Sequence, residues 1–261
     1  MHGNTVLQIA LLVYFARIHF ELPGSVQGFR SESDGQTVAA SVENVYGHSQ
    51  TGTRSLAIRV PALDAGQVAR IVTSTFIPPD SIAMPGYGLL AAPTLYAGQR
   101  LAASFKADEA NGQAVGVQLI LGIYGPDDHP QQVAGPAVQV APGAWQTLEW
   151  QIPATDQLPI FAVGLQLDSA GTIYLDSLTW DGEPDLRFGQ PPGTRSRLWR
   201  KAWVNGVDHW EWWSEEPFRL VNDEGRGMII TGTREWRNYR FSAVIRPAYL
   251  VNAGGIAVRV Q

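Results

Sequence analysis

Short runs in which apolar and polar residues alternate, separated by turn residues, most constrain what this chain can fold into. Residues 55–60 place Leu56, Ile58 and Val60 on one face, as a strand buried on one side requires. Similar runs recur along the chain, whereas helical periodicity is missing after residue 20. The other runs predicted to form strands are 37–45, 70–77, 100–106, 115–124, 146–152, 161–167 and 172–180.

Turn residues lie between these runs, and the composition agrees with them. Asp34-Gly35, Asn111-Gly112 and Pro142-Gly143 are dipeptides typical of tight turns. The 261 residues include 27 Gly, 17 Pro and 9 Trp, and only 16% are charged, against about 25% in an ordinary soluble domain. The pattern predicts an all-β chain, an antiparallel jelly-roll β-sandwich followed by a second, partial β-sandwich, with one short N-terminal helix.

Charge and cysteine content exclude several classes of protein. The formal net charge is -5 and no basic stripe is present, so no nucleic-acid partner is expected. The absence of cysteine excludes disulfides, thiolate metal sites and a cysteine nucleophile. We interpret the one basic cluster as a solvated linker, with phosphate or ADP-ribose contact as the alternative. Its members are Arg195, Arg197, Arg200 and Lys201.

Residues 6–15 form an apolar run that predicts a helix. The run is too short for a membrane span and is interrupted by Gln8 and Arg17, so no membrane partner is expected. We favour the last helix of an upstream domain, which would place the protein in the cytoplasm. A signal-peptide core, which would place it outside the cell, lacks a preceding Lys or Arg and a cleavage site. A helix packed within this fold is the third interpretation.

Composition changes near residue 183 and divides the chain. Residues 184–198 are rich in Gly and Pro and predict a linker. Six tryptophans then fall between positions 199 and 236. The expected units are a helical segment 1–19, a jelly-roll β-sandwich 20–183, the linker, and a partial sandwich 199–261. Strands expected in the last unit are 218–221, 227–231, 239–245 and 255–261. We expect the chain to be a fragment, and the alternative is that these strands complete one larger fold.

Three segments of the first unit resemble carbohydrate-binding modules of the galactose-binding-like, jelly-roll kind. Residues 20–24 resemble their opening strand and first turn, residues 47–56 a glycine-serine turn, and residues 173–180 the closing strand. The resemblance implies a structural Ca²⁺ with Glu21 and Asp176 as side-chain ligands and carbonyls of the turn beside them. Ca²⁺ takes such oxygen ligands. The alternative is that Asp176 caps a turn or bonds backbone amides.

Such modules bind sugars by stacking aromatic rings on the apolar face of a pyranose. The resemblance therefore implies candidate ligand-binding residues, each of which competes with a place in the core. Trp150 lies two strand positions after Leu148 and is expected in the core. The candidates are Tyr87, Tyr96, Tyr124 and Trp145, with Asp127 and Asp128 supplying polar contacts beside Tyr124.

The later segments carry two further resemblances. Residues 236–245 and 254–259 resemble the start of a concanavalin-like, laminin-G-type jelly roll. The order of the pieces resembles the C-terminal accessory region of bacterial ADP-ribosylglycohydrolases. The segments that carry this resemblance are residues 55–59, 93–99, 174–182 and 232–239. This implies a covalently linked catalytic domain in the parent protein. The aspartate-rich Mg²⁺ motifs of that family do not occur in this chain, so the chain itself is not expected to hydrolyse ADP-ribosyl bonds.

No catalytic motif is found along the chain. The five histidines are scattered, without a His-Glu-x-x-His or Gly-x-Ser-x-Gly pattern. We therefore expect a non-catalytic, carbohydrate- or glycoconjugate-binding accessory region of a larger hydrolase. One alternative is a structural or protein-interaction sandwich without ligand. Another is a glycoside hydrolase fragment, which needs two carboxylates about 5–10 Å apart, with Glu211, Glu215 and Glu216 as candidates.

Overall fold

The computed structural model describes residues 18–33, 35–75, 95–125, 129–183, 185–192, 198–211, 216–232, 239–247, 249–250 and 254–258. The expected N-terminal helix lies outside these residues. Within them, regular structure is almost entirely strand, and the helices are the short 3₁₀ turns η2 (Glu109–Asn111) and η3 (Leu198–Ala202). In this part of the chain no helix is long and apolar enough to cross a membrane. The all-β prediction is confirmed.

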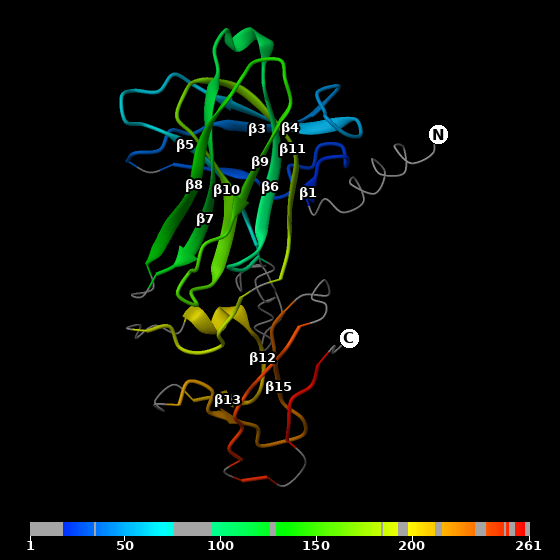
Figure 1. Cartoon of the computed structure of the whole chain (residues 1–261), viewed down its shortest axis with the longest axis vertical. Coiled ribbons are helices and arrows are strands. Elements are labelled where there is room, and N and C mark those ends of the chain that lie inside the picture. The colour runs from blue at the N-terminus through cyan, green and yellow to red at the C-terminus, as the bar shows by residue number, and fades with distance from the viewer. Residues whose placement is uncertain are drawn as a thin grey trace.

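Two antiparallel sheets pack face to face and form the sandwich (Figure 1). Sheet A has the strand order β3-β4-β11-β6-β9, with β1 beside β11, and sheet B has the order β2-β5-β10-β7-β8. Sheet A consists of β1 Ile18–His19, β3 Ser41–Tyr46, β4 Arg54–Val60, β6 Arg100–Ala107, β9 Gln146–Gln151 and β11 Gly171–Asp181. Sheet B consists of β2 Arg30–Glu32, β5 Ala69–Ser74, β7 Val115–Tyr124, β8 Pro130–Val140 and β10 Ile160–Leu167.

The core lies between the sheets and follows the alternation of the sequence. Every second residue of β7 from Val115 to Ile123 belongs to it, because successive side chains of a strand point to opposite faces. Trp150 also lies in this core with 8% of its surface exposed, as its spacing from Leu148 predicts. Burying a side chain of this kind stabilises the fold by about 2 kcal/mol, so these residues hold the two sheets together.

Strand β8 was not expected from the sequence, because Pro130, Gly135 and Pro136 interrupt its pattern. It lies at the edge of sheet B, where a proline that cannot donate to a neighbouring strand is tolerated. Its register against β7 shifts between Gln118 and Ile120. Gly135 there lies directly against the Trp150 indole, where a Cβ would come within 2.6 Å of the ring.

Beyond residue 185 the strands are short, and they occupy the opposite end of the molecule from the sandwich (Figure 1). β12 Val204–Gly206 pairs with β15 Met228–Ile230, and β13 His209–Trp210 pairs with β14 Leu220–Val221. The strands expected near 239–245 and 255–261 do not form in the described residues 239–247 and 254–258, which are exposed. A strand requires a neighbouring backbone to hydrogen-bond, and the strand pairings of the described part do not include these residues.

A cluster of aromatic side chains replaces a large core in this second unit. The ring of Trp199 makes edge contacts with Trp210 and Phe218, at centroid distances of 5.8 and 5.5 Å. The Arg200 guanidinium lies 5.4 Å from the Trp199 ring and 4.8 Å from the Trp210 ring, and it donates to the carbonyls of Trp210 and Glu211. The interpretation of the basic cluster as a solvated linker is therefore wrong for Arg200.

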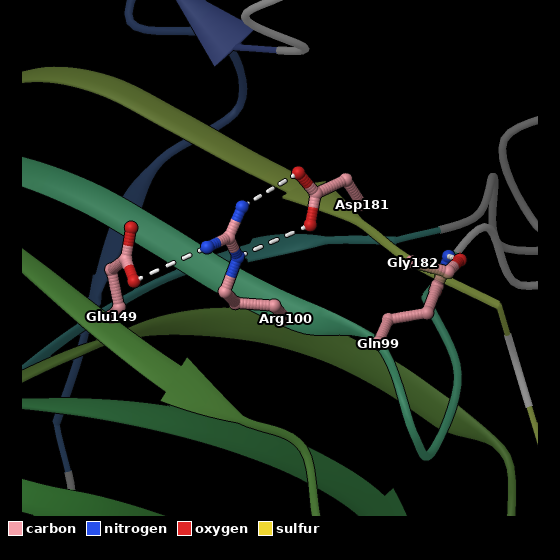
Figure 2. Close-up of polar contacts among 5 residues, drawn as sticks. All are labelled: Gln99, Arg100, Glu149, Asp181 and Gly182. Carbon is pink, nitrogen blue, oxygen red and sulfur yellow. Dashed lines mark hydrogen bonds and ion pairs between the residues drawn. The ribbon is translucent and has the colours of Figure 1, made fainter.

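The chain that leaves β11 stays attached to the sandwich. The side-chain amide of Gln99 donates to the Gly182 carbonyl over 3.5 Å, and the backbone amide of Asp185 donates to the Ala97 carbonyl over 3.2 Å. Figure 2 shows Arg100 reaching Asp181 on one side and Glu149 on the other, at 3.0 and 3.4 Å. The bonds of Gly182 and Asp185 tie the first residues after the sandwich to the turn that precedes β6, and Arg100 joins the ends of β6, β9 and β11.

Candidate functional site

One side of sheet B faces away from the core and collects polar and small side chains. In β7 the outward positions are Gly116, Gln118, Ile120, Gly122 and Tyr124, because the alternate positions fill the core. We call this surface the outer face of sheet B. The strand registers place beside them Arg30 and Glu32 of β2, Arg70, Val72 and Ser74 of β5, Ala162, Gly164 and Gln166 of β10, and Gln132, Ala134, Ala137 and Gln139 of β8.

A chain of side-chain hydrogen bonds crosses this face from strand to strand. Arg70 Nε donates to Gln166 Oε1 over 3.0 Å, and Gln166 Nε2 donates to Gln118 Oε1 over 3.4 Å. Gln118 Nε2 donates to the Gly135 carbonyl over 2.5 Å, and Gln132 Nε2 donates to Gln166 Oε1 over 3.2 Å. We call this the amide ladder. Each amide is thereby oriented by its neighbours.

Small and buried residues lie between the polar side chains on the same face. Val72, Ile120 and Ala162 form an apolar cluster of their own, separate from the main core. Gly122 lies under the ring of Phe161, where a Cβ would approach the ring to 2.7 Å. Val72, Ile120 and Ala162 are at most 3% exposed, so the accessible surface here consists of the half-buried Phe161 ring and the polar side chains around it.

An aromatic pair lies at the far end of the face. The rings of Tyr124 and Phe161 lie 4.6 Å apart between centroids, and both side chains are half-buried. Tyr124 follows Gln118 by six positions along β7, which separates the pair from the amide ladder by ~20 Å. Of the predicted ligand residues Tyr124 lies on this face, whereas its expected partners Asp127 and Asp128 lie outside the described residues.

The other predicted aromatic residues do not join this face. Tyr96 is only 6% exposed, and its hydroxyl contacts Thr231 and Gly232, while burial raises its pKa. The structure makes it a packing residue between the two units, without an open ring face for a sugar. Trp145 lies 6.0 Å from the Lys106 ammonium on sheet A, the opposite sheet. Tyr87 lies outside the described residues.

The sequence did not single out Arg70, Gln118 or Gln166. A signal was present, because Gln118 and Gln166 each interrupt a strand that is otherwise apolar on both faces. A polar residue within such a strand costs free energy unless it is hydrogen-bonded. Its presence can therefore indicate a built polar network on the outer side of a sheet.

Glu21 and Asp176 both face the turn between β3 and β4. Asp176 Oδ2 accepts hydrogen bonds from the amides of Gln50 and Thr51, over 2.8 and 2.7 Å. The Glu21 carboxylate accepts from the Thr53 amide over 3.0 Å and from the Thr53 hydroxyl over 2.8 Å. One turn thus connects the segment after β1 to the middle of β11, the positions that the resemblance assigned to the first and last strands.

The pKa values of the two carboxylates are shifted in opposite directions. Burial raises the pKa of Asp176, and the negative charge of Glu21 adds to that rise. Burial favours a higher pKa for Glu21 as well. The hydrogen bonds from Thr53 and Arg54 outweigh this effect, so the pKa of Glu21 is lowered overall. Two neighbouring carboxylates fit the oxygen preference of Ca²⁺. The described residues contain no group of three or more acidic or histidine side chains for a metal, so backbone carbonyls would have to complete the shell.

No family model and no curated protein match this sequence. Among solved structures, the CBM22-1 xylan-binding domain from Paenibacillus barcinonensis is similar, with 15% identity, 64% of this chain and 93% of that chain covered, and a TM-score of 0.48. The C-terminal family 22 carbohydrate-binding module of a Clostridium thermocellum protein is 14% identical, with 63% of this chain and 92% of that chain covered and a TM-score of 0.44. The xylan-binding module CBM15 is 18% identical, with 62% of this chain and 94% of that chain covered and a TM-score of 0.39. These TM-scores lie below 0.5, so the similarities assign neither a family nor a ligand to this chain.

Proposed function

We propose that this chain binds an oligosaccharide on the outer face of sheet B and serves as a non-catalytic part of a larger protein. The observation that carries the proposal is the amide ladder, which shares one face with the pair Tyr124 and Phe161. Oriented amides suit the paired hydroxyl groups of a sugar, and an aromatic ring suits its apolar face. The distance between the two features favours a ligand of several sugar units.

The chemistry of this face supports binding without catalysis. Glycoside hydrolysis uses two carboxyl groups on either side of the scissile bond. The central positions here carry amides, Gln118 and Gln166, which neither donate nor accept a proton at ordinary pH. Among the described residues of this face, carboxylates lie at its margins: Glu32 is on the edge strand β2, and Asp168 lies against Gly116 at the start of β7.

The test is affinity electrophoresis of the purified chain in gels containing single neutral polysaccharides, with xylan, mixed-linkage glucan, mannan and galactan among them. We expect retention in at least one gel. The double variant Gln118→Ala/Gln166→Ala should weaken binding at least about tenfold, which corresponds to ~1.4 kcal/mol. Trp145→Ala, on the opposite sheet, is the matched control and should bind as the unaltered chain does. Retention in none of the gels would refute the proposal.

The aromatic end of the face is tested separately. Tyr124→Phe keeps the ring and should retain most of the affinity, whereas Tyr124→Ala removes the stacking surface and should lose it. Isothermal titration with the oligosaccharide of the retained polysaccharide measures both. Equal affinity of the two variants would place the ligand away from Tyr124.

We also propose that the parent protein joins this chain to a hydrolase, and the ADP-ribosylglycohydrolase type is the candidate that the sequence resemblance offers. Tethering raises the local concentration of substrate without new chemistry. Reading the coding sequence on either side of this stretch tests the proposal. An in-frame catalytic domain with the aspartate-rich motifs supports it, and a non-hydrolase neighbour contradicts it.

Finally, we propose Ca²⁺ as a structural ion between Glu21 and Asp176. The supporting observation is that both carboxylates bond to one turn, Glu21 at Thr53 and Asp176 at Gln50 and Thr51, where a divalent cation could take oxygen ligands from both. Ca²⁺ should raise the midpoint of thermal unfolding and a chelator should lower it. Glu21→Gln should abolish this response, whereas Glu43→Gln, which alters an exposed ion pair with Arg59, should keep it. A midpoint that ignores Ca²⁺ would contradict the proposal.

A further inference from the structure

Two large apolar side chains stand out on the surface of the sandwich. Within its described residues, between positions 18 and 183, Leu22 and Tyr46 are the exposed large hydrophobic residues, at 64% and 70%. Tyr46 ends β3, the edge strand of sheet A, so it lies away from the outer face of sheet B. In the described part of the sandwich the other aromatic residues are buried or half-buried, so the exposed ring of Tyr46 points to a contact with something else.

A chain of contacts through Asn44 and Arg54 connects Leu22 to Tyr46. The Asn44 side-chain amide donates to the carbonyls of Leu22 and Ser25, over 3.4 and 3.0 Å, which fixes the turn that carries Leu22. Asn44 Oδ1 in turn accepts from Arg54 Nη1 over 2.8 Å. The Arg54 guanidinium lies 5.6 Å from the centroid of the Tyr46 ring. We call Leu22, Asn44, Tyr46 and Arg54 the rim patch.

Arg54 is oriented in this patch by neutral groups. Its side-chain partners are the Asn44 amide oxygen and the Tyr46 ring, and its backbone amide donates to Glu21 over 3.1 Å. In the described part of the chain no carboxylate forms an ion pair with its guanidinium, in contrast to Arg59 and Arg100. A guanidinium carries five N–H donors in a planar fork that matches a carboxylate in two-point geometry.

We infer that the rim patch binds a carboxylate-bearing sugar, a uronic acid residue of a glycan, as a second site on this chain. The pyranose ring packs on the open face of Tyr46, and its carboxylate pairs with the fork of Arg54. Asn44 holds the guanidinium in place before the ligand arrives, which reduces the ordering cost of binding. The inference does not depend on the outer face of sheet B, because the two sites share no residue.

A uronate can occur within a chain or as a branch on a neutral chain, and both present the same carboxylate. The titration therefore uses tetragalacturonate, a xylo-oligosaccharide with one glucuronate branch, and the same xylo-oligosaccharide without the branch. We expect the rim patch to bind the two acidic ligands, with affinity that falls as salt is added. If only one acidic ligand binds, it identifies the source. If neither binds better than the unbranched ligand, the inference is overturned.

Substitutions separate the two sites. Arg54→Gln should remove the preference for the acidic ligand at least tenfold, and Arg54→Lys, which keeps the charge without the fork, should lose part of it. Tyr46→Ala should weaken acidic ligands, while Tyr124→Ala on sheet B should leave them unchanged. Thermal unfolding checks that each variant is folded, because Arg54 and Tyr124 are half-buried whereas Tyr46 is exposed. If Tyr124→Ala abolishes acidic binding and Arg54→Gln does not, the acidic sugar binds on sheet B and the rim inference fails, whereas the proposed function stands.

Discussion

Gly52 lies where the turn between β3 and β4 passes closest to Glu21. A Cβ at this position would come within 2.2 Å of Glu21 Oε1, and its φ of +65° is one that residues with a side chain rarely adopt. Gly47, in the same turn, has a φ of +81° but nothing within 4 Å of its Cβ position. The two glycines thus share the backbone requirement and differ in what a methyl group would displace.

Alanine substitutions at these glycines separate the two effects. Gly47→Ala should cost ~1–2 kcal/mol of unfolding free energy for the left-handed backbone alone. Gly52→Ala should cost at least ~1 kcal/mol more, because it displaces Glu21 from its hydrogen bonds to Thr53 and Arg54. Urea denaturation measures both variants. Equal losses would show that the Glu21 contacts add nothing to stability.

Tyr174 on β11 provides a test of pH dependence. Its hydroxyl donates to Asp108, its ring stacks on His48 at 4.4 Å, and burial followed by the Asp108 contact raises its pKa from 10.0 to about 12. Because the pKa in the folded state lies above that of the unfolded chain, this tyrosine contributes stability below pH 10 that is lost as the pH rises through about 12.

The ultraviolet absorbance of tyrosinate follows this ionisation directly. A component titrating near pH 12 should be present in the unaltered chain and absent from Tyr174→Phe. The same variant should also have a flatter decline of stability in this alkaline range. A component that survives the substitution would assign the late titration to another tyrosine.

Whole strands were predictable where alternation and apolar content coincided, as in β4, β7 and β10. Strand β8 was missed because an edge position tolerates the prolines that argued against it. The expected strand near 239–245 has the right pattern, but pattern alone does not supply a partner for its backbone. Of the candidate site, the sequence placed Tyr124 at a strand end, whereas the amide ladder depends on the register between four strands, which a single sequence does not reveal.

The pairing of β5 with β10 depends on a close approach at Gly164. A Cβ there would lie 2.1 Å from the Ile71 carbonyl oxygen, a backbone atom that cannot move alone. Gly116 on β7 is the matched case, because its Cβ would meet the carboxylate of Asp168, an exposed side chain that can rotate away. Gly164→Ala should therefore destabilise the chain by ~3 kcal/mol or more, and Gly116→Ala by less than about 1 kcal/mol. Similar losses in guanidinium denaturation would contradict this reading of β5–β10 packing.

At the scale of the whole molecule, the segment expected to be a linker begins by packing on the sandwich. Asp185 bonds to Ala97, and the buried Tyr96 hydroxyl reaches Thr231 and Gly232 of the second unit. Such contacts couple the unfolding of the two parts, because unfolding one part removes hydrogen-bond partners from buried groups of the other. We therefore expect one cooperative thermal transition for the described chain instead of two.

Removing the hydroxyl of Tyr96 tests this coupling. Tyr96→Phe should lower the stability by ~1 kcal/mol and make residues 199–232 more sensitive to trypsin. Tyr249→Phe, at a position 86% exposed, is the control and should change neither property. A second transition appearing only in Tyr96→Phe would be the clearest sign of uncoupling, and identical digestion of both variants would argue against it.

The amide ladder has one more consequence, which concerns the surroundings in which the chain works. Glutamine side chains do not ionise, so the amides of Gln118, Gln132 and Gln166 present the same donors and acceptors at any acidity. Hydrogen bonds from the amide ladder to a ligand are short and directional. Dissolved ions therefore weaken these bonds far less than they weaken the attraction between separated charges. Binding of a sugar through the amide ladder would therefore be equally strong in acidic, neutral or saline media. The rim patch, which relies on a charge, would release its ligand as salinity rises.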